Sequence, residues 1–280
     1  MPPMDAINIR GVRLELQHIP GPANLAPLVF LHEGLGSVSA WGRGAHAWPR
    51  QLCAATGRAG WLYSRRGFGL SDPTPDFRGA SRDEGGWPVG RRRPDYLHHD
   101  AWVVLPDLLR QLGVQAPVLI GHSDGATIAL LHAARHEVTA CVAMAPHVFI
   151  EDMTVRAIEQ VQAAYAEKLR PKLERHHRDP DNAFWPWADI WLDPAFRGFD
   201  IQAECRDIRC PLLLVQGEDD EYASMEQLHA IARAAPQARE WALAHCGHSP
   251  HRDQPTALTA GIAQWLKALP SAPGAPASRA

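Results

Sequence analysis

The sequence has no long apolar run and no excess of one charge, and each absence excludes a class of protein. No run approaches the roughly 18 apolar residues that a membrane-spanning helix needs, so no membrane partner is predicted. The net charge of −3 gives no large positive field to attract a nucleic acid. A hydrophobic fraction of 46% over 280 residues excludes a wholly disordered chain and allows a large core.

Cysteine is also scarce. The five cysteines are scattered, and no Cys-x-x-Cys pair occurs. An odd, scattered set favours free thiols in a reducing compartment over a disulfide framework or a zinc ribbon. The segment from Met1 to Gly11 has no basic stretch followed by an apolar one, so no cleaved signal peptide is expected. These features predict a cytoplasmic protein and leave open whether it forms a homo-oligomer.

The remaining pattern predicts a parallel β-sheet covered by helices. Alternating apolar residues on both sides of Arg10 and Gly11 predict an N-terminal hairpin. Short, continuous apolar runs follow, and such runs are typical of strands buried on both faces. They lie at residues 28–31, 61–63, 118–120, 142–144, 212–215 and 241–243. Helical spacing separates them, at residues 48–55, 97–112, 124–136 and 257–268. Alternating strands and helices favour a wound α/β fold.

Two segments interrupt this alternation. Residues 72–94 form a long stretch rich in glycine and arginine, which we expect to be a functional or disordered loop. Its arginines are expected to be solvated, and contact with an acidic substrate is the alternative. Residues 147–207 contain a helical stretch and an aromatic cluster, and we expect them to form a helical cap. Residues 1–146 and 208–268 would then be the core, and residues 269–280, rich in Pro, Ala and Ser, a disordered tail.

One short motif indicates chemistry. Residues 121–125 read Gly-His-Ser-Asp-Gly and match G-x-S-x-G, between a predicted strand and a predicted helix. This context holds a serine hydroxyl exposed on a sharp turn, and the flanking glycines let the backbone fold back without side-chain clashes. Ser123 is therefore the candidate nucleophile.

A serine hydroxyl needs a base, and the base needs an orienting carboxylate. Candidate acids follow the strand at 212–215, and candidate bases follow the strand at 241–243, where a wound sheet places its active site. The acids are Glu218, Asp219, Asp220 and Glu221. The bases are His245, His248 and His251, whose spacing also raises the alternative of a metal site. Because this segment contains Gly247 and Pro250 and no familiar carboxylate ligand, we predict no metal and no cofactor.

With these motifs, the chain from about Leu28 to Leu266 resembles an α/β-hydrolase of the capped serine ester hydrolase type, similar to carboxylesterases and ring-cleavage-product hydrolases. The resemblance implies a mostly parallel, wound sheet flanked by helices, with a small helical cap. It selects Asp220, which stands three residues after a glycine, as the acid. It also selects His248, in a Gly-His pair, as the base.

The resemblance implies an oxyanion hole as well. The family's His-Gly-x-Gly segment after a strand appears here as His-Glu-Gly-Leu-Gly at residues 32–36. This match places Gly34 as one N–H donor, and Asp124, directly after the nucleophile, as the second. Two residues depart from the family pattern. Glu33 replaces a glycine beside the hole, and Ser64 replaces an aspartate at a position expected to be structural.

The expected activity is hydrolysis of a carboxylic ester or lactone of a small, largely apolar molecule through an acyl-enzyme on Ser123. The alternatives are hydrolysis of a carbon–carbon bond in a ring-cleavage dienoate, and a ligand-binding receptor of the same fold. Candidate pocket residues come from the motifs and from the aromatic cluster of the expected cap. They are Glu33, His122, Phe184, Trp185, Trp187 and Trp191.

Overall fold

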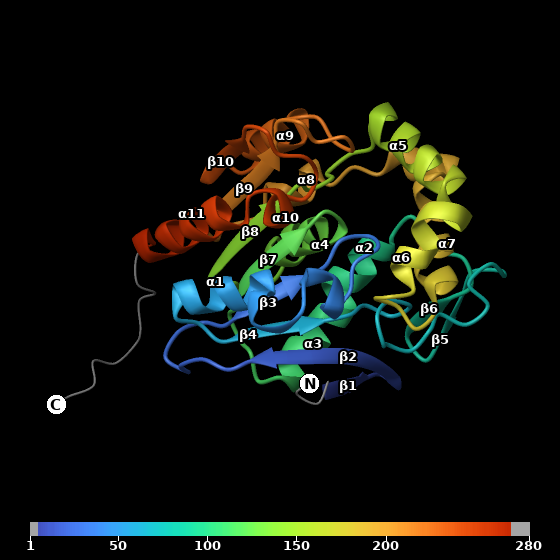
Figure 1. Cartoon of the computed structure of the whole chain (residues 1–280), viewed down its shortest axis with the longest axis horizontal. Helices are drawn as coiled ribbons and strands as arrows, with labels where there is room; N and C mark the ends of the chain where they lie inside the picture. The colour runs from blue at the N-terminus through green and yellow to red at the C-terminus, as the bar shows by residue number, and fades with distance from the viewer. Residues whose placement is uncertain (1–4, 270–280) are drawn as a thin grey trace.

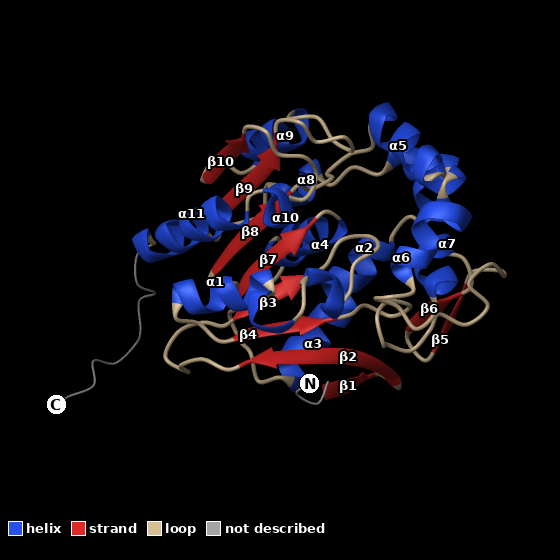
Figure 2. Cartoon of the chain, in the orientation of Figure 1, coloured by secondary structure: helices blue, strands red, loops and turns tan. Residues whose placement is uncertain are grey.

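The computed structural model describes residues 5–269 and is built on one eight-stranded sheet. The order across the sheet is β1-β2-β4-β3-β7-β8-β9-β10. The two N-terminal strands are antiparallel to their neighbours, and the other six run parallel (Figure 2). The strands are β1 (Asp5–Ile9), β2 (Val12–Ile19), β3 (Leu28–Leu31), β4 (Gly60–Tyr63), β7 (Val118–His122), β8 (Ala140–Met144), β9 (Leu212–Gly217) and β10 (Ala238–Leu243).

Helices cover both faces of this sheet (Figure 1). On one face, α1 (Trp48–Thr56) packs against α11 (Pro255–Ala268) over an apolar layer that includes Phe30 and Val142. On the other face lie α2 (Tyr96–His99), α3 (Leu105–Gln111), α4 (Asp124–Ala133), α8 (Gln202–Cys205) and α9 (Glu226–Ala234). The predicted α/β-hydrolase architecture, a mostly parallel sheet flanked by helices, is confirmed.

The segment between β8 and α8 carries its own helices. These are α5 (Asp152–Ala163), α6 (Arg170–Leu173) and α7 (Pro180–Trp191), with a π-helical turn at Tyr165–Leu169 and a 3₁₀ turn at Pro194–Gly198. They lie beyond the carboxyl ends of the parallel strands, at the right of Figure 1. The segment is closed at its neck, because Phe149 and Asp200 form an antiparallel bridge. We propose that residues 147–207 act as a cap over the sheet edge.

Three segments differ locally from regular helices and loops or lie at the end of the described residues. Pro106 lies in the first turn of α3, directly after a π-helical stretch at Asp100–Val104, so the helix changes its winding there. Residues 72–94 include an ordered hairpin of β5 (Arg82–Glu84) and β6 (Trp87–Val89). The predicted disordered tail lies outside the described residues, apart from Leu269.

The strand order determines where a ligand can bind. From β3 the chain passes to β4 on one side, and it later returns to β7 on the other side. The connections therefore diverge between β3 and β7, and such a switch point opens a crevice at the carboxyl ends of the two strands. Glu33 and Gly34 follow β3, and Ser123 follows β7. The motifs found in the sequence thus meet at this crevice.

Candidate active site

Ser123 occupies a strained turn between β7 and α4. Its φ is 54° and its ψ −121°, a conformation that L-residues rarely adopt. The turn requires glycine on both sides. A Cβ on Gly121 would lie 2.3 Å from the carbonyl oxygen of Gly125, and a Cβ on Gly125 would lie 2.0 Å from that of Leu31. These contacts explain why this strand-to-helix turn, called the elbow below, needs glycine on both sides of Ser123.

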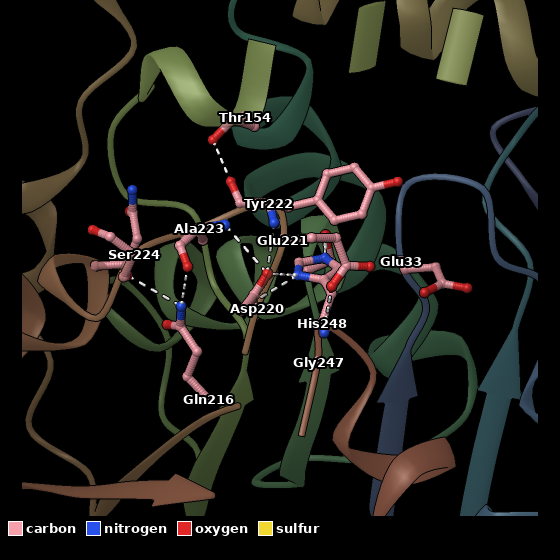
Figure 3. A network of polar contacts seen from close by, with 12 residues as sticks. Glu33, Thr154, Gln216, Asp220, Glu221, Tyr222, Ala223, Ser224, Gly247 and His248 are labelled. Carbon is pink, nitrogen blue, oxygen red and sulfur yellow. Dashed lines mark hydrogen bonds and ion pairs between the residues drawn. The ribbon is translucent and has the colours of Figure 1, made fainter. Parts of the chain in front are cut away.

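The serine, histidine and aspartate selected by the sequence form a continuous chain of hydrogen-bonding atoms. His248 Nε2 lies 3.0 Å from Ser123 Oγ. His248 Nδ1 lies 2.9 Å from each carboxylate oxygen of Asp220 (Figure 3). Asp220 Oδ1 also accepts hydrogen bonds from the backbone N–H groups of Tyr222 and Ala223, at 2.8 and 3.2 Å. The carboxylate is thereby fixed on the side of the imidazole away from the serine.

Asp220 and His248 each shift the pKa of the other. Burial disfavours the charged form of His248, but the hydrogen bond to Asp220 and its negative charge outweigh burial and raise the pKa of His248. Burial also acts to raise the pKa of Asp220, yet the hydrogen bond and charge of His248 lower it overall. Asp220 is therefore ionised at neutral pH and holds Nδ1 of His248 as a donor.

The other candidate acids and bases are not part of the hydrogen-bonded chain Ser123–His248–Asp220. Glu218 and Asp219 are exposed, and their backbone N–H groups bond to the carbonyl oxygens of Leu243 and Cys246, both at 2.9 Å. Glu221 accepts from the backbone N–H of His248 at 3.1 Å. These bonds join the loop after β9 to the loop after β10. His245 is exposed, and the buried His251 packs against Trp41 and Trp48.

The two predicted oxyanion donors both border the cavity above Ser123. Within residues 5–269, neither the N–H of Gly34 nor that of Asp124 donates to a protein acceptor. Trp187 packs directly onto Gly34, since a Cβ on Gly34 would lie 2.1 Å from the indole Nε1 of Trp187. Glycine is therefore the residue that lets α7 approach the loop after β3.

A buried polar network lies beneath this hole. The Asp124 carboxylate accepts from both terminal nitrogens of Arg65 at 3.3 Å and from the Tyr96 hydroxyl at 3.0 Å. Tyr96 in turn accepts from the indole N–H of Trp191 at 3.0 Å. Arg65 also donates to the carbonyl oxygen of Glu33 at 2.9 Å. The network therefore ties the residue after the nucleophile to the loop that carries Gly34.

Glu33 is engaged by charged partners on two sides. Its carboxylate lies 3.0 Å from His122 Nδ1 and accepts from Arg252 at 2.9 Å. Burial would raise the pKa of Glu33, but the charges of His122 and Arg252 hold it well below its usual value. His122 Nε2 lies 2.7 Å from the carbonyl oxygen of His248 and must donate to it. His122 thereby connects the loop after β3 to the loop after β10.

The position of Ser64, which departs from the family pattern, is structural. Its hydroxyl donates to the buried carboxylate of Glu15 at 2.6 Å and accepts from the backbone N–H of Val38 at 2.9 Å. Glu15 therefore supplies the carboxylate that Ser64 itself lacks.

A cavity of about 580 Å³ opens above the serine. Its apolar walls include Leu35, Ile158, Leu169, Leu173, Trp187 and Trp191, and Glu33 borders it as well. The structure places the other three predicted pocket residues outside this lining. Phe184 is buried and stacks on Tyr165, Trp185 stacks under Arg78, and His122 lies beneath Glu33. The arginines of residues 78–93 do not border this cavity either.

Comparison with known proteins agrees with this fold. The family model described as the alpha/beta hydrolase family matches residues 28–262. The chain belongs to the alpha/beta hydrolase family. No curated protein matches the sequence.

Solved structures similar to this α/β-hydrolase differ in what they act on. A meta-cleavage product hydrolase from Pseudomonas fluorescens, complexed with acetates, is 15% identical with a TM-score of 0.67, and the match covers 94% of this chain and 97% of that one. A thermophilic esterase from Thermogutta terrifontis, with malate bound, is 17% identical with a TM-score of 0.66, over 94% and 98% of the two chains. An enol-lactonase from Burkholderia xenovorans is 17% identical with a TM-score of 0.64, over 94% and 100%. At these identities the likeness shows the fold.

Sequence reasoning missed several residues that border the cavity of this α/β-hydrolase, among them His147, Tyr222 and Arg252. His147 is buried, its ring centroid lies 5.6 Å from that of His248, and burial lowers its pKa to about 4, so it is neutral. Tyr222 packs against the His248 ring at 4.8 Å. The signal that the sequence offered for each was its position. Tyr222 stands directly after the candidate acids, His147 follows a strand, and Arg252 follows the base.

Within residues 5–269, no cluster of three or more His, Cys, Asp or Glu side chains is arranged to hold a metal. Over the same residues, no helix combines the length and apolar character needed to cross a bilayer. All five cysteines are free, as predicted, and four of them are buried.

Proposed function

We propose that the protein is a serine hydrolase that cleaves a carboxylic ester or lactone of a small, largely apolar molecule. The observation that carries this proposal is the hydrogen-bonded chain Ser123–His248–Asp220, which ends in a hydroxyl that borders a cavity with apolar walls. A buried, oriented base within 3.0 Å of a strained serine is the arrangement that nucleophilic acyl transfer needs.

The reaction follows from the positions of these groups. Ser123 Oγ attacks the acyl carbon while its proton moves to His248 Nε2. The resulting imidazolium is stabilised by the ionised Asp220, which keeps Nδ1 protonated. His248 then gives the proton to the leaving alcohol oxygen, and the acyl-enzyme remains. Water, deprotonated by the same nitrogen, releases the acid and restores the serine.

Charge develops on the acyl oxygen during both attacks. The N–H groups of Gly34 and Asp124 border the same cavity as the serine and are free to donate to that oxygen. One such donor is typically worth about 2.7–4 kcal/mol of transition-state stabilisation. Trp187 and Trp191, both on α7, would line the acyl or alcohol group. We propose that α5 to α7 act as the cap that excludes water from this cavity.

A second candidate is hydrolysis of a carbon–carbon bond in a ring-cleavage dienoate. The similarity to a meta-cleavage product hydrolase is the specific observation in its favour. The same triad can serve both reactions. The similarities to an esterase and an enol-lactonase support the ester or lactone reading. A receptor with this fold would retain the serine and lack sustained turnover.

The test combines intact-mass labelling by a fluorophosphonate with turnover of p-nitrophenyl acetate, butyrate and octanoate. Wild type and Ser123→Ala are run in parallel. We expect one label on the wild type, none on the variant, and a loss of turnover larger than about a thousandfold in the variant. Labelling without ester turnover, but with turnover of a dienoate, would transfer the assignment to the second candidate. Labelling with no turnover of either would favour a receptor, and an unlabelled wild type would contradict the proposal.

A further inference from the structure

We propose that the substrate carries an anionic group, which binds to a cationic rim on one side of the cavity mouth. The rim is defined here as Arg43, Lys172, Arg175, His176 and Arg252. This inference rests on the proposed function and adds the class of substrate. Four of the five residues border the cavity itself, and Arg43 lies directly behind them.

Three separate segments converge to build the rim. Lys172, Arg175 and His176 come from α6 and the turn after it, and Arg252 from α10 (Pro250–Asp253). Arg43, from the loop before α1, donates to the carbonyl oxygen of Arg175 at 2.6 Å. His176 is held in place by the Ser39 hydroxyl, 2.9 Å from its Nδ1. The position of the rim is therefore fixed by both the core and the proposed cap.

The rim holds more positive charge than its neighbours neutralise. Within residues 5–269, Arg43, Lys172 and Arg175 have no carboxylate within 4.0 Å, whereas many other arginines of this chain do. Burial lowers the pKa of His176, and the nearby Arg43, Arg252 and Arg175 lower it further, so His176 is a neutral member of the rim and its positive charge comes from the arginines and Lys172. Like charges held together favour binding of an anion between them.

The acidic residues of the cavity do not cancel this charge. The Asp124 carboxylate is bound by Arg65, and the Glu33 carboxylate by His122 and Arg252. Glu221 borders the cavity on the side of the base, where it accepts from the N–H of His248. In Figure 3 Glu221 lies beside His248 and Tyr222. The mouth is therefore polarised, with its unneutralised cations on the α6 side.

A substrate that fits this cavity has two unlike parts. Its ester lies at Ser123, and its apolar part contacts Leu35, Trp187 and Trp191. A carboxylate or another oxyanion at one end of the molecule reaches Lys172 and Arg175, which offer several N–H donors to it. The anionic group is carried by either the acyl part or the alcohol part of the ester, and the experiment below distinguishes these two positions.

The experiment compares esters of equal length with and without a negative charge. Mono-p-nitrophenyl succinate, adipate and suberate are matched with p-nitrophenyl butyrate, hexanoate and octanoate, which places the charge on the acyl half. 3-Carboxy-4-nitrophenyl butyrate, compared with p-nitrophenyl butyrate, places it on the alcohol half. At low salt we expect kcat/KM to favour the anionic ester by about tenfold in one of these series, and the preference to shrink in 0.5 M NaCl.

Two matched double variants assign the preference to the rim. In Lys172→Gln/Arg175→Gln, the ratio of kcat/KM for the anionic ester to that for the neutral ester should fall to about one. The control, Arg206→Gln/Arg239→Gln, removes the same charge from exposed positions that do not border the cavity. It should keep the ratio of the wild type.

Binding of an anion to the rim can also be measured without any ester hydrolysis. The fluorescent sulfonate 1-anilinonaphthalene-8-sulfonate and its uncharged counterpart N-phenyl-1-naphthylamine are titrated into Ser123→Ala with and without the rim substitutions. We expect a severalfold loss of affinity for the sulfonate alone.

The outcomes separate the two proposals. If neutral esters are hydrolysed, no anionic ester is preferred and the sulfonate affinity is unchanged, the inference is wrong and the proposed function stands. If Ser123 is not labelled and no ester is cleaved, the proposed function fails, and the sulfonate titration alone decides the inference.

Discussion

At the scale of single residues, three histidines near Ser123 lie in different surroundings. His147 is buried and neutral, with its pKa lowered to about 4 by burial and by the neighbouring His248. His122 lies between two oxygen acceptors, the carbonyl oxygen of His248 and the carboxylate of Glu33. His248 has a raised pKa, despite burial, because of Asp220. His248 is also the histidine whose Nε2 lies 3.0 Å from Ser123 Oγ, which suits it to the role of base.

This arrangement predicts the pH dependence of ester hydrolysis. His248 must be neutral to accept the serine proton, so kcat/KM should rise with pH through the pKa of His248, and its midpoint should lie above the ordinary value of 6.5. The measurement is kcat/KM for p-nitrophenyl butyrate between pH 5 and 9.

Asp220→Asn is the matched variant for this profile. It removes the charge that raises the pKa of His248, so the midpoint should move to lower pH. The rate should fall by about 10⁴-fold, because the base is then held in the wrong tautomer. A profile that is flat from pH 5 to 8, or a midpoint that stays in place in Asp220→Asn, would rule out His248 as the base.

At the scale of elements, the strands and the order of the triad residues could be predicted from the sequence. The buried parallel strands have continuous apolar runs, and the run at Leu28–Leu31 matches β3 residue for residue. The motif and the Gly-His pair depend on local backbone geometry, which short sequences encode. His147 follows a strand without any motif, and its place beside His248 depends on how β8 aligns with β7 and β9. Such tertiary placement leaves no local pattern.

The pocket residues show the same limit. The sequence indicated an aromatic cluster on α7, but not which face of the helix points to the cavity. Trp187 and Trp191 are four residues apart and border it, whereas Phe184 and Trp185 pack against Tyr165 and beneath Arg78. Spacing alone does not select the lining, because Phe184 stands three residues before Trp187 on the same face and is instead covered by Tyr165.

The contact between α4 and β3 leads to a prediction about stability. In Gly125→Ala, the new methyl group would lie 2.0 Å from the carbonyl oxygen of Leu31, so the elbow must shift away from β3. We expect the free energy of unfolding to fall by at least about 1–3 kcal/mol, as for other overpacked sites. Urea unfolding measures it.

Gly198→Ala is the control, because nothing lies within 4 Å of a Cβ at that position. It should change the midpoint of unfolding little. Equal midpoints for the two variants would show that the elbow tolerates the methyl group.

At the scale of the whole molecule, one apolar cluster joins the sheet to the proposed cap. It contains Leu105 and Leu119 from the core, together with Trp191, Phe196 and Ile201 from the inserted segment. α5 is also tied to the loop that carries the acid, since the Thr154 hydroxyl donates to the carbonyl oxygen of Tyr222 at 2.5 Å (Figure 3). The inserted helices therefore share their stabilising contacts with the core.

This shared cluster predicts a single unfolding transition. In urea, tryptophan fluorescence and far-ultraviolet circular dichroism should follow the same curve with one midpoint, because the inserted helices cannot lose Trp191 and Phe196 from the cluster without exposing the core. An earlier fluorescence transition, with most of the helical signal retained, would show instead that the inserted segment unfolds on its own.

The bridge between Phe149 and Asp200 has a consequence for how such proteins diversify. The chain leaves and re-enters the core at one point, so the intervening residues can lengthen, shorten or be exchanged without altering the spacing of the strands. Ser123, Asp220 and His248 all lie outside the exchanged stretch, whereas Lys172, Arg175, Trp187 and Trp191 lie inside it. A graft between relatives at residues 149 and 200 should transfer substrate preference and leave the chemistry with the recipient.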